Sequence, residues 1–140
     1  MSADPFSNRP LSVFDISGRA MSAQLVRLNT TASNLANAGA VAGSRAQAFR
    51  AMRPVFQATE FGPGVATVGV DRIVRSNIEP TRQHDPNHPL ADANGDVWVA
   101  GVDTAQELVE MVEASRQYQN NVQVLQTAKT LTLDTLRLGQ

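Results

Sequence analysis

The sequence predicts an α+β fold in which two long terminal helices pair as an antiparallel coiled coil, with a small β-rich insert between them. Three observations lead to this prediction. Apolar residues recur in heptads near the start of the chain and again in its last third, whereas most prolines and glycines lie between these stretches. A heptad repeat keeps one stripe of a helix facing a partner helix. Prolines and glycines interrupt helices, so the middle is predicted to form strands and turns.

The C-terminal helix is predicted from about Asp103 to Leu138, a stretch without proline or glycine. Its main stripe alternates steps of three and four residues: Leu108, Met111, Ser115, Tyr118, Val122 and Leu125. A second stripe consists of Val124, Ala128, Leu131, Thr135 and Leu138, with Leu133 and Leu136 between the two. Such a helix would be roughly 50 Å long. Because it is apolar on more than one side near its end, it needs more than one neighbour.

The N-terminal helix is predicted from about Ser12 to Asn37, and Ser12 with Asp15 has the form of a capping box. The two positions of its heptad are filled by Phe14, Met21, Leu28 and Leu35, and by Gly18, Leu25 and Ala32. Asn34 and Asn37 are expected to make side-chain hydrogen bonds at the helix end. The polar run 29–34 favours helix weakly, so packing must supply much of the stability.

The insert between the helices is predicted to contain short strands. Val65–Val74 is rich in β-branched residues with partial alternation, and Phe49–Gln57 is a second, less regular strand. Asn94 and Gly95 form a hairpin signal that precedes a strand at Val97–Val99. The chain thus divides into a disordered lead-in (1–10), an N-terminal helix (11–38), the insert (39–101) and a C-terminal helix (102–140).

Composition narrows the class of protein. The chain has 140 residues, the size of one domain. Its net charge of −1 produces no positive electrostatic field that would favour binding of nucleic acid. It has no cysteine, so disulfide and thiolate chemistry are absent. We see no cleavable signal peptide and no apolar run that reaches the length of a membrane span. The sequence therefore predicts neither nucleic-acid binding nor membrane insertion.

Residues for catalysis or metal binding are few. His84 and His88 are four residues apart beside Asp85, but Pro86 and Pro89 forbid the helix that would bring them together. The segment Asp92–Asp96 differs from a calcium-binding loop because its glycine stands fourth rather than sixth. We therefore predict no catalytic, metal-binding or cofactor-binding residue. A small hydrolase that uses His84 or His88 with a nearby carboxylate is the alternative from the enzyme class.

Several motifs resemble the bacterial flagellar rod and hook proteins. Near the N-terminus these are Phe14–Gly18 (FDISG), Ala20–Gln24 (AMSAQ), Arg27–Asn29 (RLN) and Thr31–Asn37 (TASNLAN). Near the C-terminus they are Met111–Gln119 (MVEASRQYQ), Asn121–Val124, Lys129–Leu131 and Leu136–Gln140. The segment His88–Gly95 (HPLADANG) resembles one found in a member that forms the proximal rod. The resemblance covers nearly the whole chain.

The resemblance implies a structural subunit of the proximal rod of the flagellar basal body, not an enzyme. Such a subunit polymerises helically around the export channel, with both terminal helices in an inner coiled-coil layer, and transmits torque to the hook. It would lie in the periplasm after type III export without a cleaved signal. The implied partners are copies of itself, the rod proteins FlgB, FlgF and FlgG, the rod-base protein FliE and the type III export apparatus. The alternatives are another flagellar axial subunit or a helical export chaperone.

Assembly is predicted to depend on apolar and amide side chains of the two helices. On the N-terminal helix these are Phe14, Met21, Leu25, Leu28, Asn34, Leu35 and Asn37. On the C-terminal helix they are Leu108, Met111, Tyr118, Val122, Leu125, Leu131 and Leu136. Apolar stripes of this kind ordinarily form a core, so the open question is whether they cover one another or a neighbouring subunit.

Overall fold

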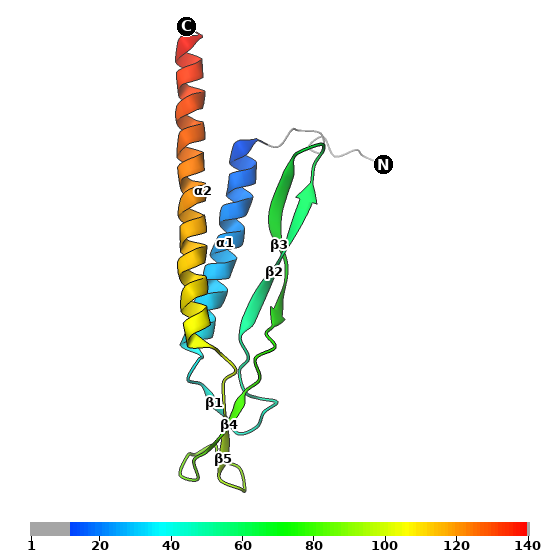
Figure 1. Cartoon of the computed structure of the whole chain (residues 1–140), viewed down its shortest axis with the longest axis vertical. Coiled ribbons are helices and arrows are strands. Elements are labelled where there is room, and N and C mark those ends of the chain that lie inside the picture. The colour runs from blue at the N-terminus through cyan, green and yellow to red at the C-terminus, as the bar shows by residue number, and fades with distance from the viewer. Residues whose placement is uncertain (1–11, 140) are drawn as a thin grey trace.

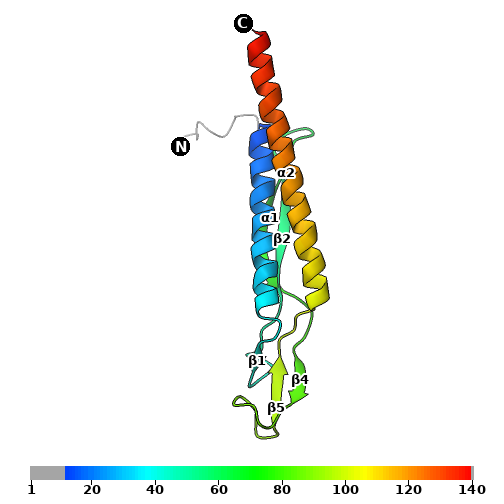
Figure 2. The ribbon, with the colours of Figure 1, turned by 90° about the vertical axis from the view of Figure 1, so that its left-hand side faces the viewer.

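The chain forms an elongated α+β structure, seen in a computed structural model that describes residues 12–139. Helices α1 (Val13–Ala36) and α2 (Thr104–Leu138) lie side by side and run in opposite directions (Figures 1 and 2). The strands between them in sequence are paired antiparallel, which confirms the α+β part of the prediction, two helices with a β insert between them. The lead-in predicted at 1–10 lies outside the described residues.

Both helices begin at side-chain caps that the sequence indicates. The Ser12 hydroxyl accepts a hydrogen bond from the Asp15 N–H at 3.1 Å, and the Asp15 carboxylate accepts one from the Ser12 N–H at 3.0 Å. This is the predicted capping box. Asp103 caps α2 by accepting from the Gln106 N–H at 3.1 Å. These contacts satisfy amide groups that the first turn of a helix leaves without partners.

A long hairpin packs along α1, on the side away from α2 (Figure 1). It consists of β2 (Met52–Glu60) and β3 (Ala66–Arg75), with an irregularity in register between Val55 and Phe56. The predicted strand Val65–Val74 matches β3 to within one residue. The other predicted strand begins later than expected, at Met52, because the preceding backbone pairs elsewhere. Ala51 N–H donates to the Gly101 carbonyl at 3.1 Å, and Gly101 N–H donates to the Phe49 carbonyl at 2.8 Å.

A small three-stranded sheet lies beyond the ends of the helices (Figure 2). Its order is β1 (Val41–Ala42), β5 (Asp96–Val99) and β4 (Thr81–His84). Strand β5 contains the predicted strand Val97–Val99, whereas β1 and β4 were not predicted. Gly95 has the positive φ of +75° that its turn signal implied. However, β4 and β5 are joined by the whole segment 85–95 rather than by a tight turn at Asn94–Gly95.

The described part of the chain has a thin core. Its buried apolar residues are all alanines apart from one valine: Ala23, Ala48, Ala51, Val97, Ala100 and Ala114. Two of the largest fully buried side chains are polar, Glu107 and Asn34. Within residues 12–139, neither helix has the length and apolar character needed to cross a bilayer.

Helix α2 continues well past the start of α1 (Figure 1). Every described residue from Lys129 to Gly139 is exposed. Leu131, Leu136 and Leu138 lie in this part, with exposed fractions of 62, 65 and 88%. This segment therefore has apolar side chains without the neighbour that the sequence indicated they need.

Candidate assembly site

The stripe of α2 that faces the rest of the chain differs slightly from the predicted one. It includes Met111, Tyr118 and Leu125 as expected, all of them half-buried. However, Glu107 and Ala114 are fully buried, whereas Leu108 is 52% exposed. Residues 107, 111, 114, 118, 121, 125 and 128 follow the same alternation of four and three, so the covered stripe lies beside the predicted one. Leu108 consequently faces away from α1.

The residues predicted for assembly fall into three groups by exposure. Five are exposed: Phe14, Leu25, Leu108, Leu131 and Leu136. Eight are half-buried within the chain: Met21, Leu28, Leu35, Asn37, Met111, Tyr118, Val122 and Leu125. Asn34 is fully buried. The exposed group is available to other chains, whereas Asn34 acts within the subunit.

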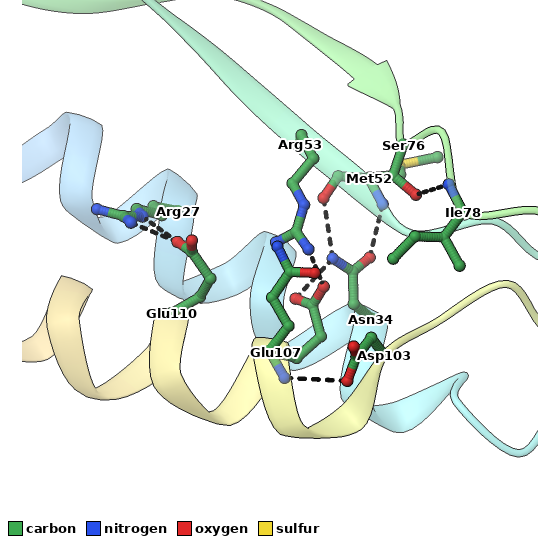
Figure 3. A network of polar contacts seen from close by, with 10 residues as sticks. Arg27, Asn34, Met52, Arg53, Ser76, Ile78, Asp103, Glu107 and Glu110 are labelled. Atoms are coloured by element: carbon green, nitrogen blue, oxygen red, sulfur yellow. Dashed lines mark hydrogen bonds and ion pairs between the residues drawn. The ribbon is translucent and has the colours of Figure 1, made fainter.

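Asn34 joins α1 to the hairpin and to α2 (Figure 3). Its Oδ1 accepts from the Met52 N–H at 2.8 Å, and its Nδ2 donates to the Met52 carbonyl at 2.9 Å. The same Nδ2 donates to Glu107 Oε2 at 3.0 Å. Asn37 Nδ2 donates to the Ser33 carbonyl at 2.8 Å, near the end of α1. The side-chain hydrogen bonds expected of both asparagines are therefore present.

Glu107 is a buried carboxylate with a charged partner on the hairpin (Figure 3). Its Oε1 lies 2.6 Å from Nη2 of Arg53, whose side chain is 24% exposed. A buried charge is tolerated only when it is paired and hydrogen-bonded, as this one is. We call the set Asn34, Arg53 and Glu107 the polar junction. It fixes α1, α2 and β2 to one another at a single level.

Further ion pairs join the helices nearer the surface. Arg27 Nε donates to Glu110 Oε2 at 2.9 Å, and Arg27 Nη2 lies 3.5 Å from Glu113 Oε2. Arg19 instead lies over the ring of Phe61 at the hairpin tip, 5.3 Å from its centroid. The exposed members of such pairs contribute little stability, about 0–1 kcal/mol each.

His84 is the last residue of strand β4, and His88 lies in the loop between β4 and β5. His84 Nδ1 lies 2.9 Å from Asp96 Oδ1, whereas His88 Nδ1 accepts from the Leu90 N–H at 3.1 Å. Among residues 12–139, no three side chains of the metal-ligating types are grouped to hold an ion. Asp92 accepts from the N–H groups of Asp96 and Asn94, and these hydrogen bonds lower the pKa of its carboxyl.

Two features of the site were not predicted from the sequence. The first is the pairing of Glu107 with Arg53. Position 107 fits the heptad spacing of the covered stripe, but a search for apolar residues at that spacing does not select a glutamate. The second is an outer apolar ridge on α2, formed by Leu108, Val109 and Val112, which are 52, 66 and 53% exposed. The i, i+3 spacing of Val109 and Val112 puts both on one face, but spacing alone does not show that this face is the exposed one.

Both ends of the chain match families of flagellar rod proteins. The family described as "Flagella basal body rod protein" matches residues 14–43, and "Flagellar basal body rod FlgEFG protein C-terminal" matches residues 93–138. Flagellar basal-body rod protein FlgC of Salmonella typhimurium is 47% identical over 132 residues, covering 93% of this chain and 98% of the relative.

Two other relatives have the same coverage. FlgC of Yersinia enterocolitica is 47% identical over 131 residues, and FlgC of Buchnera aphidicola subsp. Acyrthosiphon pisum is 32% identical over 133 residues. Each alignment covers 93% of this chain and 98% of the relative. Identity at this level over nearly full length assigns the family: the chain belongs to the FlgC family of flagellar basal-body rod proteins.

Proposed function

We propose that the protein is a structural subunit of the proximal rod of the flagellar basal body, which polymerises helically around the export channel and transmits torque to the hook. The observation that carries the proposal is the unpaired end of α2. Leu131, Leu136 and Leu138 are exposed on a helix that extends past α1. Exposed apolar surface of this kind marks a site of contact with other proteins.

Membership of a family of rod structural proteins, not of enzymes, sets aside the hydrolase alternative at His84 and His88. We infer that the chain acts through contacts alone, with copies of itself and with other rod components. FlgB, FlgF, FlgG and FliE are the proposed neighbours, and the type III export apparatus is the proposed route. The proposed location is the periplasmic rod, reached without cleavage of a signal peptide.

The two helices are proposed to form an antiparallel coiled coil in the inner layer of the rod. Their half-buried stripe, with Met111, Tyr118 and Leu125 on α2, supports this pairing. In the free subunit the stripe is only partly covered. Neighbouring subunits would cover the remaining surface, including Phe14 and Leu25 on α1, which are 43 and 44% exposed. Burial of each large apolar side chain is worth about 1.5–3 kcal/mol.

The test is complementation of a strain that lacks the gene, with the Leu131→Asp variant. Leu131 is 62% exposed, so the substitution leaves the packing within the subunit intact. If Leu131 is buried between subunits, an aspartate at this position should abolish hook formation and swimming. The purified variant should still unfold at the wild-type urea midpoint. Leu125→Asp should also block incorporation, but Leu125 is half-buried against the rest of the chain.

Thr130→Asp is the matched control, because Thr130 is the exposed neighbour of Leu131 and carries no apolar surface of comparable size. We expect it to support swimming. Normal numbers of hooks with Leu131→Asp would contradict the proposed role of the α2 end in assembly.

A further inference from the structure

A groove of about 540 Å³ opens between α1 and β3, on the side of α1 that does not face α2. Its lining is mainly apolar or small, and includes Phe14, Gly18, Ala23, Val26, Val68 and Val70. Asp15 and Arg19 also line it, one turn of α1 apart. The groove is therefore an apolar trough with one acidic and one basic side chain near the end formed by the first turns of α1.

The outer ridge of α2 (Leu108, Val109 and Val112) lies on the opposite side of the molecule from the hairpin (Figure 1). Glu113 and Arg116 adjoin it in one shallow surface depression. Ridge and groove are thus two different surfaces, so contact between them is heterologous. A heterologous contact between copies generates a ring or an open helix, depending on whether it closes.

The charges at the two surfaces match when both copies point the same way. Along the molecule from the small sheet upward, the ridge presents its apolar residues first, then Glu113, then Arg116. In the same direction, α1 presents Val26 and Ala23, then Arg19, then Asp15, because it runs opposite to α2. Glu113 would therefore meet Arg19, and Arg116 would meet Asp15. Such complementarity fixes the register and orientation of a contact.

The pairing also implies a step along the long axis. Arg27 faces Glu110, and Val13 lines a surface with Val124, so Val112 stands near the level of Leu25 in its own subunit. To place Glu113 opposite Arg19 of a neighbour, the neighbour must shift by about five helical residues, or roughly 7.5 Å. A heterologous contact with such an axial step produces a helical array rather than a flat ring.

We propose that one copy of this chain inserts the outer ridge of its α2 into the α1/β3 groove of the next copy, in parallel orientation, with Glu113 paired to Arg19 and Arg116 to Asp15. This inference rests on the proposed rod function and specifies the contact between copies. In the single chain Glu113 lies near Arg27, and Arg19 lies over the ring of Phe61. Both charged side chains therefore already have a favourable contact within the subunit.

Disulfide cross-linking tests the contact, because the chain contains no cysteine of its own. Val112 is on the ridge, and Ser22 lines the groove within two helical residues, about 3 Å, of the level that the axial step assigns to Val112. A chain with both Val112→Cys and Ser22→Cys, expressed in the deletion strain, should form an oxidant-dependent ladder of dimers and larger species. Two singly substituted chains expressed together should give dimers only.

The control replaces Ser22→Cys by Ser33→Cys, which is exposed on the same helix but outside the groove. This pair should give no ladder. Absence of the ladder in cells that swim with the Val112→Cys, Ser22→Cys chain would overturn the contact while leaving the rod function intact. Dimers of Val112→Cys alone would overturn it too, since they require two ridges to meet. Failure of the wild-type gene to restore swimming would instead refute the proposed function.

Charge exchange provides a second test that does not depend on cysteine. Glu113→Arg and Arg19→Glu should each strongly reduce the fraction of cells that bear hooks. Combining both in one chain should return that fraction close to the wild-type value. The exchange restores neither the contact with Arg27 nor that with Phe61, so rescue reports the pair between copies. A double variant that is no better than either single one would contradict the proposal.

Discussion

Replacement of Glu107 by alanine should destabilise the isolated subunit more than any surface ion-pair substitution. Glu107 is fully buried, 2.6 Å from Arg53 and hydrogen-bonded to Asn34 at 3.0 Å. Removing one partner of a buried pair costs about 3–5 kcal/mol because the other charge remains without compensation. We expect the lower end, about 3 kcal/mol, since the Arg53 side chain as a whole is still 24% exposed, although its Nη2 atom is buried.

The assay is urea unfolding of the purified chain, followed by circular dichroism. With a slope of about 2 kcal/mol per molar urea, a loss of about 3 kcal/mol lowers the midpoint by about 1.5 M. Glu107→Gln keeps an oxygen for Asn34 but loses the charge, so its midpoint should fall between those of Glu107→Ala and wild type. Glu113→Ala is the control, because Glu113 is 56% exposed and lies 3.5 Å from Arg27.

The control should cost no more than about 1 kcal/mol, as exposed pairs do. Equal midpoints for Glu107→Ala and Glu113→Ala would refute the reasoning. They would mean that the polar junction does not hold the three elements together in solution.

Two further predictions concern the small sheet and its junction with the helices. Gly101→Ala should cost about 1–3 kcal/mol in urea unfolding, because a Cβ there would lie 2.4 Å from the Ile78 carbonyl oxygen. Gly39→Ala should be nearly neutral, because a Cβ there would have no atom within 4 Å. Equal effects of the two substitutions would contradict the close approach at Gly101. The Asp92 carboxylate accepts hydrogen bonds from two backbone N–H groups, which lower its pKa in the folded state. Its contribution to stability is therefore complete above the unfolded pKa of about 3.9 and is lost as the pH falls through the folded pKa. Asp92→Asn should therefore flatten the loss of stability below about pH 4 in acid-unfolding curves, and an unchanged slope would show that those hydrogen bonds do not persist in solution.

The helices could be predicted closely because their signals are local. Ser12 and Asp15 specify the start of α1, and Asp103 specifies that of α2, through hydrogen bonds that span only three residues. The long stretch without proline or glycine then carries α2 to Leu138. Periodicity alone placed the α2 stripe within one residue of the covered face. It could not decide between positions 107 and 108, because the choice depends on Arg53, which lies far away in sequence.

The insert was harder to predict because its pairings are long-range. Strand β1 pairs with β5 across more than fifty residues of chain, and its two residues, Val41 and Ala42, carry no strand pattern of their own. Strand β4 is equally short and wholly exposed, so alternation gave no signal. The late start of β2 follows from the bonds of Phe49 and Ala51 to Gly101. Tertiary contacts of this kind override local propensity.

The candidate surfaces were predictable only in part for a related reason. The apolar end of α2 was apparent, since Leu131, Leu133, Leu136 and Leu138 exceed what one partner helix can cover. The ridge at Leu108, Val109 and Val112 was not, because a sequence does not indicate which of two adjacent stripes the first helix will cover. Burial of Glu107 decides this, and it turns Leu108 outward.

The most direct test of the central claim is electron microscopy of basal bodies isolated from cells that lack this gene, with and without complementation. If the chain is a proximal rod subunit, cells without it should yield no rod and no hook. The wild-type gene should restore both, and the Leu131→Asp variant should restore neither. Complete rods and hooks in cells that lack the gene would contradict the account.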